Sequence, residues 1–198
     1  MISDRLRKQM EFIIEVDKVK NIFRQTKIHD GTRRENDAEH SWHLALMAFL
    51  LSEHAIEKSF DLLKVMKMCI IHDLVEIDAG DTFCYDAKGN LDKLEREEAA
   101  AKRLFGILPS DQAQEFHSLW QEFDAMETLE ARYAAALDRI QPVLLNYVNQ
   151  GGTWREHGIT KAQVIARNGH IQKGAPEIWE FVSQIIDDAE AKGYFKEA

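Results

Sequence analysis

Three side chains that can bind a metal or move a proton stand together in one apolar stretch of the chain. Residues 70–81 read Ile-Ile-His-Asp-Leu-Val-Glu-Ile-Asp-Ala-Gly-Asp, which places His72, Asp73 and Glu76 in a mostly hydrophobic segment. Burying an imidazole or a carboxylate without a partner is costly, so such groups are paired or bound to metal. On a helix, Glu76 lies one turn beyond the other two, so all three side chains can face one cavity. The pattern predicts a buried helix that ends at Gly80 and carries a chemical site.

The same dipeptide occurs a second time, as His29-Asp30, and offers a comparison. There Gly31 follows in a polar stretch, which predicts an exposed turn. A His-Asp pair alone is therefore weak evidence. The apolar surroundings of His72 distinguish the first pair from the second.

Two other predicted helices each carry a polar side chain into an apolar setting. His40 lies in the first turn of a helix that begins near residues 36–37 and is apolar at almost every position over 42–51. Asp138 is the only acid on the small, apolar face of a helix predicted over 128–150. Such an acid is either an acceptor in helix packing or a ligand whose charge is balanced nearby.

These candidates form a mixed nitrogen and oxygen set that suits one divalent transition metal, such as Mn, Co, Ni, Fe or Zn. A metal of this kind acidifies bound water and polarises a phosphoryl oxygen, as hydrolysis of a phosphomonoester requires. Glu76 is placed to deprotonate the attacking water and protonate the leaving alcohol, with a salt-bridge role as the alternative. The four candidate ligands are His40, His72, Asp73 and Asp138.

In order and context these residues resemble the motifs of the HD-domain metal-dependent phosphohydrolases, in particular the 5′-deoxynucleotidase branch with its bacterial and human members. The resemblance covers most of the chain. It implies that the four candidate ligands hold the metal and that Glu76 is the catalytic acid and base. The matching motifs are Arg33-x-Glu35-Asn36-x-x-Glu39-His40-Ser41, His72-Asp73-x-x-Glu76-x-x-x-Gly80-Asp81, and Asp138.

The resemblance also implies which residues contact the substrate. Asp81 matches a family acid near the nucleotide sugar, and Arg33 matches a family arginine before the metal-binding helix. Arg33 could equally form an ion pair with one of the glutamates after it. The family deoxynucleotidase has an Arg-Trp pair in the first connection, whereas residues 23–27 read Phe-Arg-Gln-Thr-Lys. Arg24 can substitute for that arginine, but the stacking tryptophan is missing, so a preference for deoxynucleotides does not follow.

The spacing of apolar residues predicts an all-α fold, because a 3.6-residue period runs through nearly every long segment and alternating β-branched runs are lacking. The resemblance implies a compact HD-fold bundle of about eight helices, with the whole chain, 1–198, as one domain. Its metal-site core spans roughly 35–150, and helices within 160–192 pack on it. The expected helices cover residues 4–23, 36–51, 61–80, 91–105, 109–123, 128–150, 160–168 and 176–192.

Two apolar patterns within these helices favour burial rather than a ligand site. Residues 42–51 are apolar almost all round, which is typical of an interior helix. In the helix over 109–123, a stripe of side chains at helical spacing is expected to be core. The stripe consists of Ala113, Phe116, Trp120 and Phe123.

The composition indicates which classes of binding partner and which cellular compartment to expect. A net charge of −9 argues against a nucleic-acid polymer or an anionic membrane as the main partner. The two cysteines, Cys69 and Cys84, form no disulfide framework, and no signal segment or membrane-length apolar run occurs, so we expect a cytoplasmic protein. Family members are dimeric, so a homodimer is implied, and helices over 91–123 offer surface for it.

The hypothesis that best fits these features is a metal-dependent phosphohydrolase acting on a small phosphomonoester. The favoured substrate is a nucleoside 5′-monophosphate. A metal-bound water would attack phosphorus in line while Glu76 handles the proton. One alternative is an HD-fold sensor that binds a nucleotide without hydrolysing it, although binding alone needs no buried acid and base. Another is a helical oligomerisation protein with an incidental metal.

Overall fold

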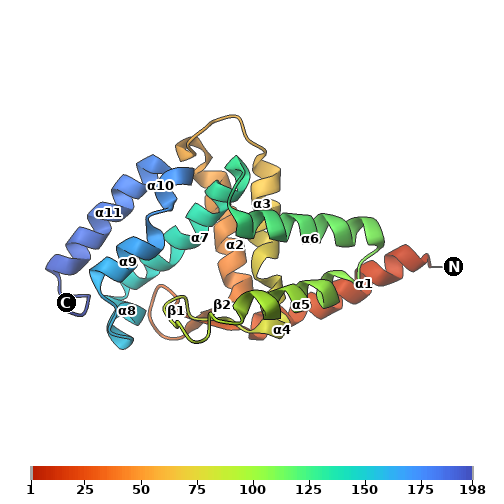
Figure 1. Cartoon of the computed structure of the whole chain (residues 1–198), viewed down its shortest axis with the longest axis horizontal. Coiled ribbons are helices and arrows are strands. Elements are labelled where there is room, and N and C mark those ends of the chain that lie inside the picture. The colour runs from red at the N-terminus through yellow and green to blue at the C-terminus, as the bar shows by residue number, and fades with distance from the viewer. Residues whose placement is uncertain (1, 198) are drawn as a thin grey trace.

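Helices make up most of the protein, whose computed structural model describes residues 2–197 (Figure 1). Within that range, eight α-helices have eight or more residues, in agreement with the all-α prediction. They are α1 (Asp4–Val16), α2 (Asp37–Leu50), α3 (Leu62–Ile71), α5 (Lys93–Phe105), α6 (Ser110–Ala125), α7 (Leu129–Val148), α9 (Lys161–Asn168) and α11 (Pro176–Ala191). Shorter helical segments are α4 (Glu76–Ala79), α8 (Gly152–Glu156) and α10 (Ile171–Gly174), with 3₁₀ turns η1 (Asp17–Asn21), η2 (Ser52–His54) and η3 (His72–Val75).

A small antiparallel sheet replaces the end of the predicted first helix. β1 (Phe23–Lys27) pairs with β2 (Arg34–Asn36), so α1 ends at Val16 and not at Phe23. Phe23, the last residue of the predicted helix, is 49% exposed because it opens a two-stranded ribbon with solvent on one side. The turn between the strands contains Gly31 at φ +71°, which confirms the turn expected after His29-Asp30.

The helix α7 runs through the middle of the molecule and contacts α2, α3, α6, α10 and α11 (Figure 1). Its buried face includes Ala131, Ala134 and Ala135, whose small side chains allow neighbouring helices to approach closely. The C-terminal helices α10 and α11 lie against it. This central helix carries Asp138, and its position fixes the site from one side.

The helices α2 and α3 are less buried than their apolar sequences predicted. Each packs on α7 and on the other helix with one side, and the opposite side lies at the surface. Trp42 is 67% exposed and Phe49 is 65% exposed, so the prediction that this helix is buried all round is wrong. We call the exposed large apolar side chains of these two helices the α2–α3 face; it consists of Trp42, Leu46, Phe49, Leu50, Leu63 and Ile70.

Within residues 2–197, no helix has the length and apolar character that crossing a membrane requires.

The start of α2 is fixed by a reciprocal pair of hydrogen bonds. The Oδ1 of Asn36 accepts the backbone N–H of Glu39 at 3.0 Å, and the Oε2 of Glu39 accepts the backbone N–H of Asn36 at 3.2 Å. This capping box satisfies two backbone donors that the first turn leaves without partners. It confirms the predicted start near residues 36–37 and sets the position of His40 one turn later.

Replacing Asn36 by alanine removes the capping acceptor, so we expect Asn36→Ala to lower the free energy of unfolding by about 1 kcal/mol. Urea denaturation followed by circular dichroism measures the change. Asn36→Ser keeps an acceptor at the same position and should stay within a few tenths of a kcal/mol of the native protein. Equal losses in the two variants would contradict the capping role.

Candidate metal centre

The His72-Asp73 motif lies where an α-helix changes to a tighter turn. The sequence predicted one helix from Asp61 to Gly80, and both ends are confirmed: Asp61 caps α3, and α4 ends at Gly80 with φ +75°. Between them the chain forms the 3₁₀ turn η3 rather than a continuous α-helix. Residues three apart eclipse one another in a 3₁₀ turn, which brings Glu76 close to Asp73.

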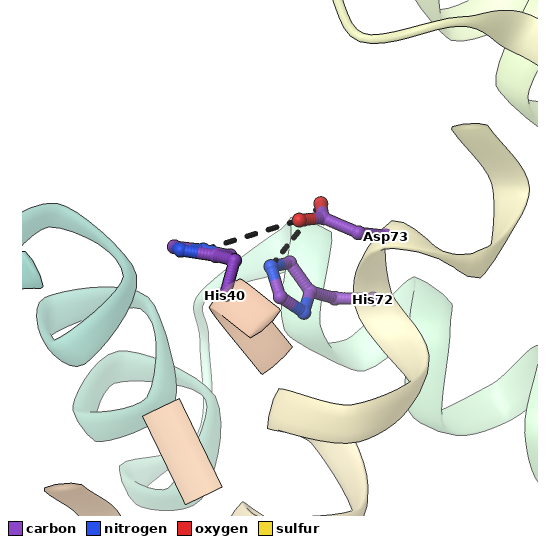
Figure 2. A group of neighbouring side chains, drawn as sticks. All are labelled: His40, His72 and Asp73. Carbon is purple, nitrogen blue, oxygen red and sulfur yellow. Dashed lines mark ion pairs between the residues drawn. The ribbon is translucent and has the colours of Figure 1, made fainter. Parts of the chain in front are cut away.

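The structure brings the four predicted ligands together from three separate elements. His40 comes from α2, His72 and Asp73 from η3, and Asp138 from α7. All four side chains are buried. Figure 2 shows the two rings and the Asp73 carboxylate facing one another.

The distances between these side chains are compatible with one shared ion. The Nε2 of His40 lies 2.9 Å from Asp138 Oδ1 and 3.9 Å from Asp73 Oδ2. The Nε2 of His72 lies 3.2 Å from Asp73 Oδ1 and 3.7 Å from Asp138 Oδ1. Two atoms that each lie about 2.1 Å from one ion can be at most about 4.2 Å apart. Every one of these separations is below that limit.

His72 has the hydrogen-bonding state that a metal ligand requires. Its Nδ1 lies 3.0 Å from the carbonyl oxygen of Cys69, so Nδ1 carries the hydrogen and donates it. Its Nε2 faces the carboxylates, and this buried atom has no hydrogen-bond partner among residues 2–197. Burial alone would lower the pKa of His72, but the charges of Asp73 and Asp138 outweigh burial and raise it to about 10. In the absence of metal a proton on Nε2 therefore balances these carboxylates, and a metal ion could replace that proton, so the residues present fit a metal ion.

His40 is oriented by a buried chain of polar groups that the sequence analysis missed. Its Nδ1 lies 3.2 Å from Gln141 Oε1, and Gln141 Nε2 donates to Glu35 Oε1 at 2.5 Å. His40 Nδ1 therefore carries the hydrogen, and Nε2 is directed toward Asp138. The one available signal was spacing, because Gln141 lies three residues after Asp138 on the same helix face.

The buried carboxylates differ in protonation. Burial alone would raise the pKa of Asp73, but the charges of His72 and Arg24 outweigh burial and lower it. Burial, followed by the charges of Asp73 and Asp37, raises the pKa of Glu76 well above its usual value. One carboxylate is therefore held ionised, as a ligand must be, while its neighbour retains a proton.

Arg24 lies inside the centre and not at its mouth. Its Nη1 is 2.6 Å from Asp73 Oδ2 and 3.5 Å from Asp37 Oδ1, and its Nη2 is 3.8 Å from Asp138 Oδ1. The side chain is only 13% exposed. The guanidinium therefore neutralises the same carboxylates that a divalent ion would contact.

Arg33, the other arginine predicted to contact substrate, lies on the surface away from the cavity. It forms an ion pair with Glu39 through two hydrogen bonds of 2.6 and 2.8 Å. This arrangement is the alternative that the sequence left open. Glu39 also completes the capping box of α2, so the pair stays at the helix start.

A cavity of about 150 Å³ opens over the predicted ligands. Asp81, the predicted sugar contact, lines it. Trp120 and Phe123, which were expected only in the core, also line it, and the ring of Phe123 lies 4.6 Å from that of His72. The aromatic stripe therefore forms core on one side and a wall of the cavity on the other. Further lining residues include His72, Asp73, Glu76, Asp138, Arg24, Arg139 and Arg167.

Comparison with known proteins identifies the family of this chain as the HD domain family. The sequence profile of that family matches residues 16–179, so the chain belongs to it, and the predicted resemblance is confirmed. The crystal structure of a predicted metal-dependent phosphohydrolase from Magnetospirillum magnetotacticum is 50% identical, covers all of both chains and superposes with a TM-score of 0.94.

Curated relatives are more distant. The 5′-deoxynucleotidase HDDC2 of Homo sapiens is 26% identical over 139 residues, which cover 70% of this chain and 66% of the human protein. The HDDC2 protein of Dictyostelium discoideum is 27% identical over 143 residues, which cover 70% of this chain and 75% of that protein. The chain thus spans about two thirds of the human relative.

Replacing Arg24 by methionine tests its role as an internal cation. Without metal, Arg24→Met leaves the buried carboxylates uncompensated, which costs on the order of 3–5 kcal/mol. We therefore expect a lower Tm in chelator, and added divalent metal should restore most of the loss. Arg155→Met on the exposed side of α8 is the control and should leave Tm unchanged. The same loss of Tm with and without metal would exclude competition for one site.

Replacing Gln141 by leucine removes the acceptor for His40 Nδ1. Outer hydrogen bonds of this kind orient a ligand, and their loss typically weakens metal binding by about 10- to 100-fold. Competition with a chromophoric chelator measures that affinity. The exposed substitution Gln172→Leu should have no effect. Native metal affinity in Gln141→Leu would show that the ring is held by packing alone.

Proposed function

We propose that this protein is a metal-dependent phosphohydrolase that cleaves a small phosphomonoester, with a nucleoside 5′-monophosphate as the favoured substrate. The observation that carries the proposal is the convergence of two imidazole Nε2 atoms and two carboxylates beside the buried Glu76. The names of the relatives, a 5′-deoxynucleotidase and a predicted metal-dependent phosphohydrolase, support the reaction class. The nucleotide substrate is our extension from relatives of 26–27% identity.

We assign the metal to one divalent transition ion, chosen from Mn, Co, Ni, Fe and Zn, which the mixed ligand set suits. When bound, such an ion acidifies water and polarises a phosphoryl oxygen. The chain contributes the orientation of its ligands, because the carbonyl of Cys69 and the amide of Gln141 fix the two rings. The assigned ligands are His40, His72, Asp73 and Asp138.

We assign the proton transfers to Glu76. Its carboxylate lies with those of Asp73 and Asp37 in one buried cluster, and its Oε2 has no hydrogen-bond partner within the described chain. A bound divalent ion would add positive charge beside Glu76 and favour its ionised form, which in the proposed reaction takes a proton from the water that attacks phosphorus. The bond from phosphorus to the ester oxygen breaks on the opposite side, and Glu76 gives the proton to that oxygen. The products are inorganic phosphate and an alcohol.

Two of the three substrate contacts predicted from the sequence remain in the proposal. Asp81 lines the cavity and can accept a hydrogen bond from a sugar hydroxyl. Arg24 lines it as well and is retained as a candidate contact to the substrate. Arg33 is not part of the proposal, because its guanidinium is paired with Glu39 outside the cavity.

We propose a homodimer formed through the α2–α3 face instead of the surface expected over 91–123. Six large apolar side chains on two packed helices are exposed there. Apolar patches of this kind on a soluble protein are typical of interaction surfaces. Self-association would remove these side chains from water.

Phosphate release from ribo- and deoxyribonucleoside monophosphates, with Mn, Co or Zn supplied, tests the proposed reaction. We expect turnover by the native protein and a loss of roughly 10²- to 10⁴-fold in Glu76→Gln, with metal binding retained. Glu95→Gln, at an exposed position of α5, is the matched control and should keep native turnover. Full turnover in Glu76→Gln would refute its role. If the native protein releases no phosphate with any of the metals, the proposed enzymatic activity is refuted. The alternative would then be an HD-fold sensor that binds a nucleotide without hydrolysing it.

A further inference from the structure

Two further arginines line the cavity that holds the carboxylates of the metal centre. Arg139 follows Asp138 on α7, and Arg167 lies near the end of α9, yet both side chains line the same cavity. Neither residue belongs to the motifs on which the proposed function rests. Sequence spacing does not connect them, because 27 residues and a change of helix separate Arg139 from Arg167.

The two arginines lack the partners that buried cations normally have. The Nε atoms of Arg139 and Arg167 are buried and make no hydrogen bond with any described residue. Arg139 reaches one carboxylate oxygen, with its Nη1 3.4 Å from Asp138 Oδ2, and no ion pair within residues 2–197 involves Arg167. Burial, and after it the charge of Arg139, lowers the pKa of Arg167, so the two cations lie close enough to repel.

A third basic side chain shares this environment. The Nε2 of His170 is also buried without a hydrogen-bond partner in the described part of the chain. Burial comes first, and the charges of Arg139 and Arg167 next, among the causes that lower the pKa of His170. The buried Nε donors of Arg139 and Arg167 therefore lack acceptors within residues 2–197, which is rare in proteins unless a ligand or water supplies them.

The chemistry of that ligand follows from the donors and from the carboxylates in the same cavity. Guanidinium groups match the oxygens of phosphate in fixed, forked geometry. Asp73 and Asp81 also line the cavity, and their negative charges would repel a phosphate dianion. An anion in this cavity therefore gains most when its free oxygens face the arginines.

We propose that Arg139 and Arg167 bind the non-bridging oxygens of the substrate's phosphoryl group. This inference rests on the proposed function, which places a phosphomonoester in this cavity. The same inference predicts which class of phosphate ester the protein prefers. A monoester presents three non-bridging oxygens and two negative charges, whereas a diester presents two oxygens and one charge. Two guanidiniums thus favour monoesters over diesters.

Binding of inorganic phosphate tests the assignment without requiring turnover. Calorimetry with the metal-loaded protein should give a Kd that rises by roughly 10- to 100-fold in Arg139→Gln and in Arg167→Gln, as expected for loss of a charged hydrogen bond. Arg155→Gln, an exposed arginine outside the cavity, should bind phosphate like the native protein. Because phosphate is the probe, the test remains valid even if no ester is hydrolysed.

A second measurement applies when hydrolysis is observed. Rates with 4-nitrophenyl phosphate and with bis(4-nitrophenyl) phosphate give the monoester preference as a ratio of kcat/KM. We expect both glutamine variants to lower that ratio by at least about 10-fold, mainly through the KM of the monoester. An unchanged ratio would overturn the ester preference. An unchanged Kd for phosphate in both variants would overturn the anion site itself.

Lysine variants keep the inference testable if the glutamine variants do not fold. Arg139→Lys and Arg167→Lys retain the charge but lose the forked geometry, so phosphate binding should weaken while Tm stays near the native value. Native phosphate affinity in both folded lysine variants would show that the forked contacts do not exist. If the variants bound another anion more weakly but bound phosphate with native affinity, that result would also contradict the assignment.

Discussion

Negative charge confined within a dry helical core is the constraint on which this structure depends. Asp37, Asp73, Glu76 and Asp138 are all buried around one small volume, and carboxylates in such a place repel one another unless cations or protons compensate. The chain uses both means. Arg24 supplies a cation from β1, and a retained proton lowers the charge at Glu76. A divalent ion at the same position would complete the compensation, which is why we interpret the cluster as a metal centre.

The fold is arranged so that this cluster is rigid. Each ligand comes from a helix or tight turn whose end is fixed locally: a capping box starts α2, Asp61 caps α3, and Thr128 caps α7. Both histidine rings are then oriented from outside the centre, by the carbonyl of Cys69 and by Gln141. Metal sites need this outer support, because a ligand that rotates freely loses entropy on binding. The small side chains of α7 allow the surrounding helices to approach the centre closely.

The residues that we propose as the centre could be picked out from the sequence, whereas the surfaces around them could not. His72 and Asp138 were found because a charged or polar group in an apolar helix face needs a compensating partner, and that signal is local. The β1–β2 ribbon was missed because its strands are too short to show alternation. The exposure of Trp42 depends on which side of α2 meets α7, and a helix that is apolar all round does not encode that choice. Arg139 and Arg167 meet only through tertiary packing, so no spacing rule connects them.

The central claim is that the four converging side chains bind one divalent ion, and a crystal structure with Zn supplied tests it most directly. Anomalous scattering at the zinc edge locates the ion without reference to activity. The account predicts one peak per chain, about 2.0–2.2 Å from the Nε2 atoms of His40 and His72 and from carboxylate oxygens of Asp73 and Asp138. A fully loaded crystal with zinc only at other positions, or with no zinc bound, would contradict it.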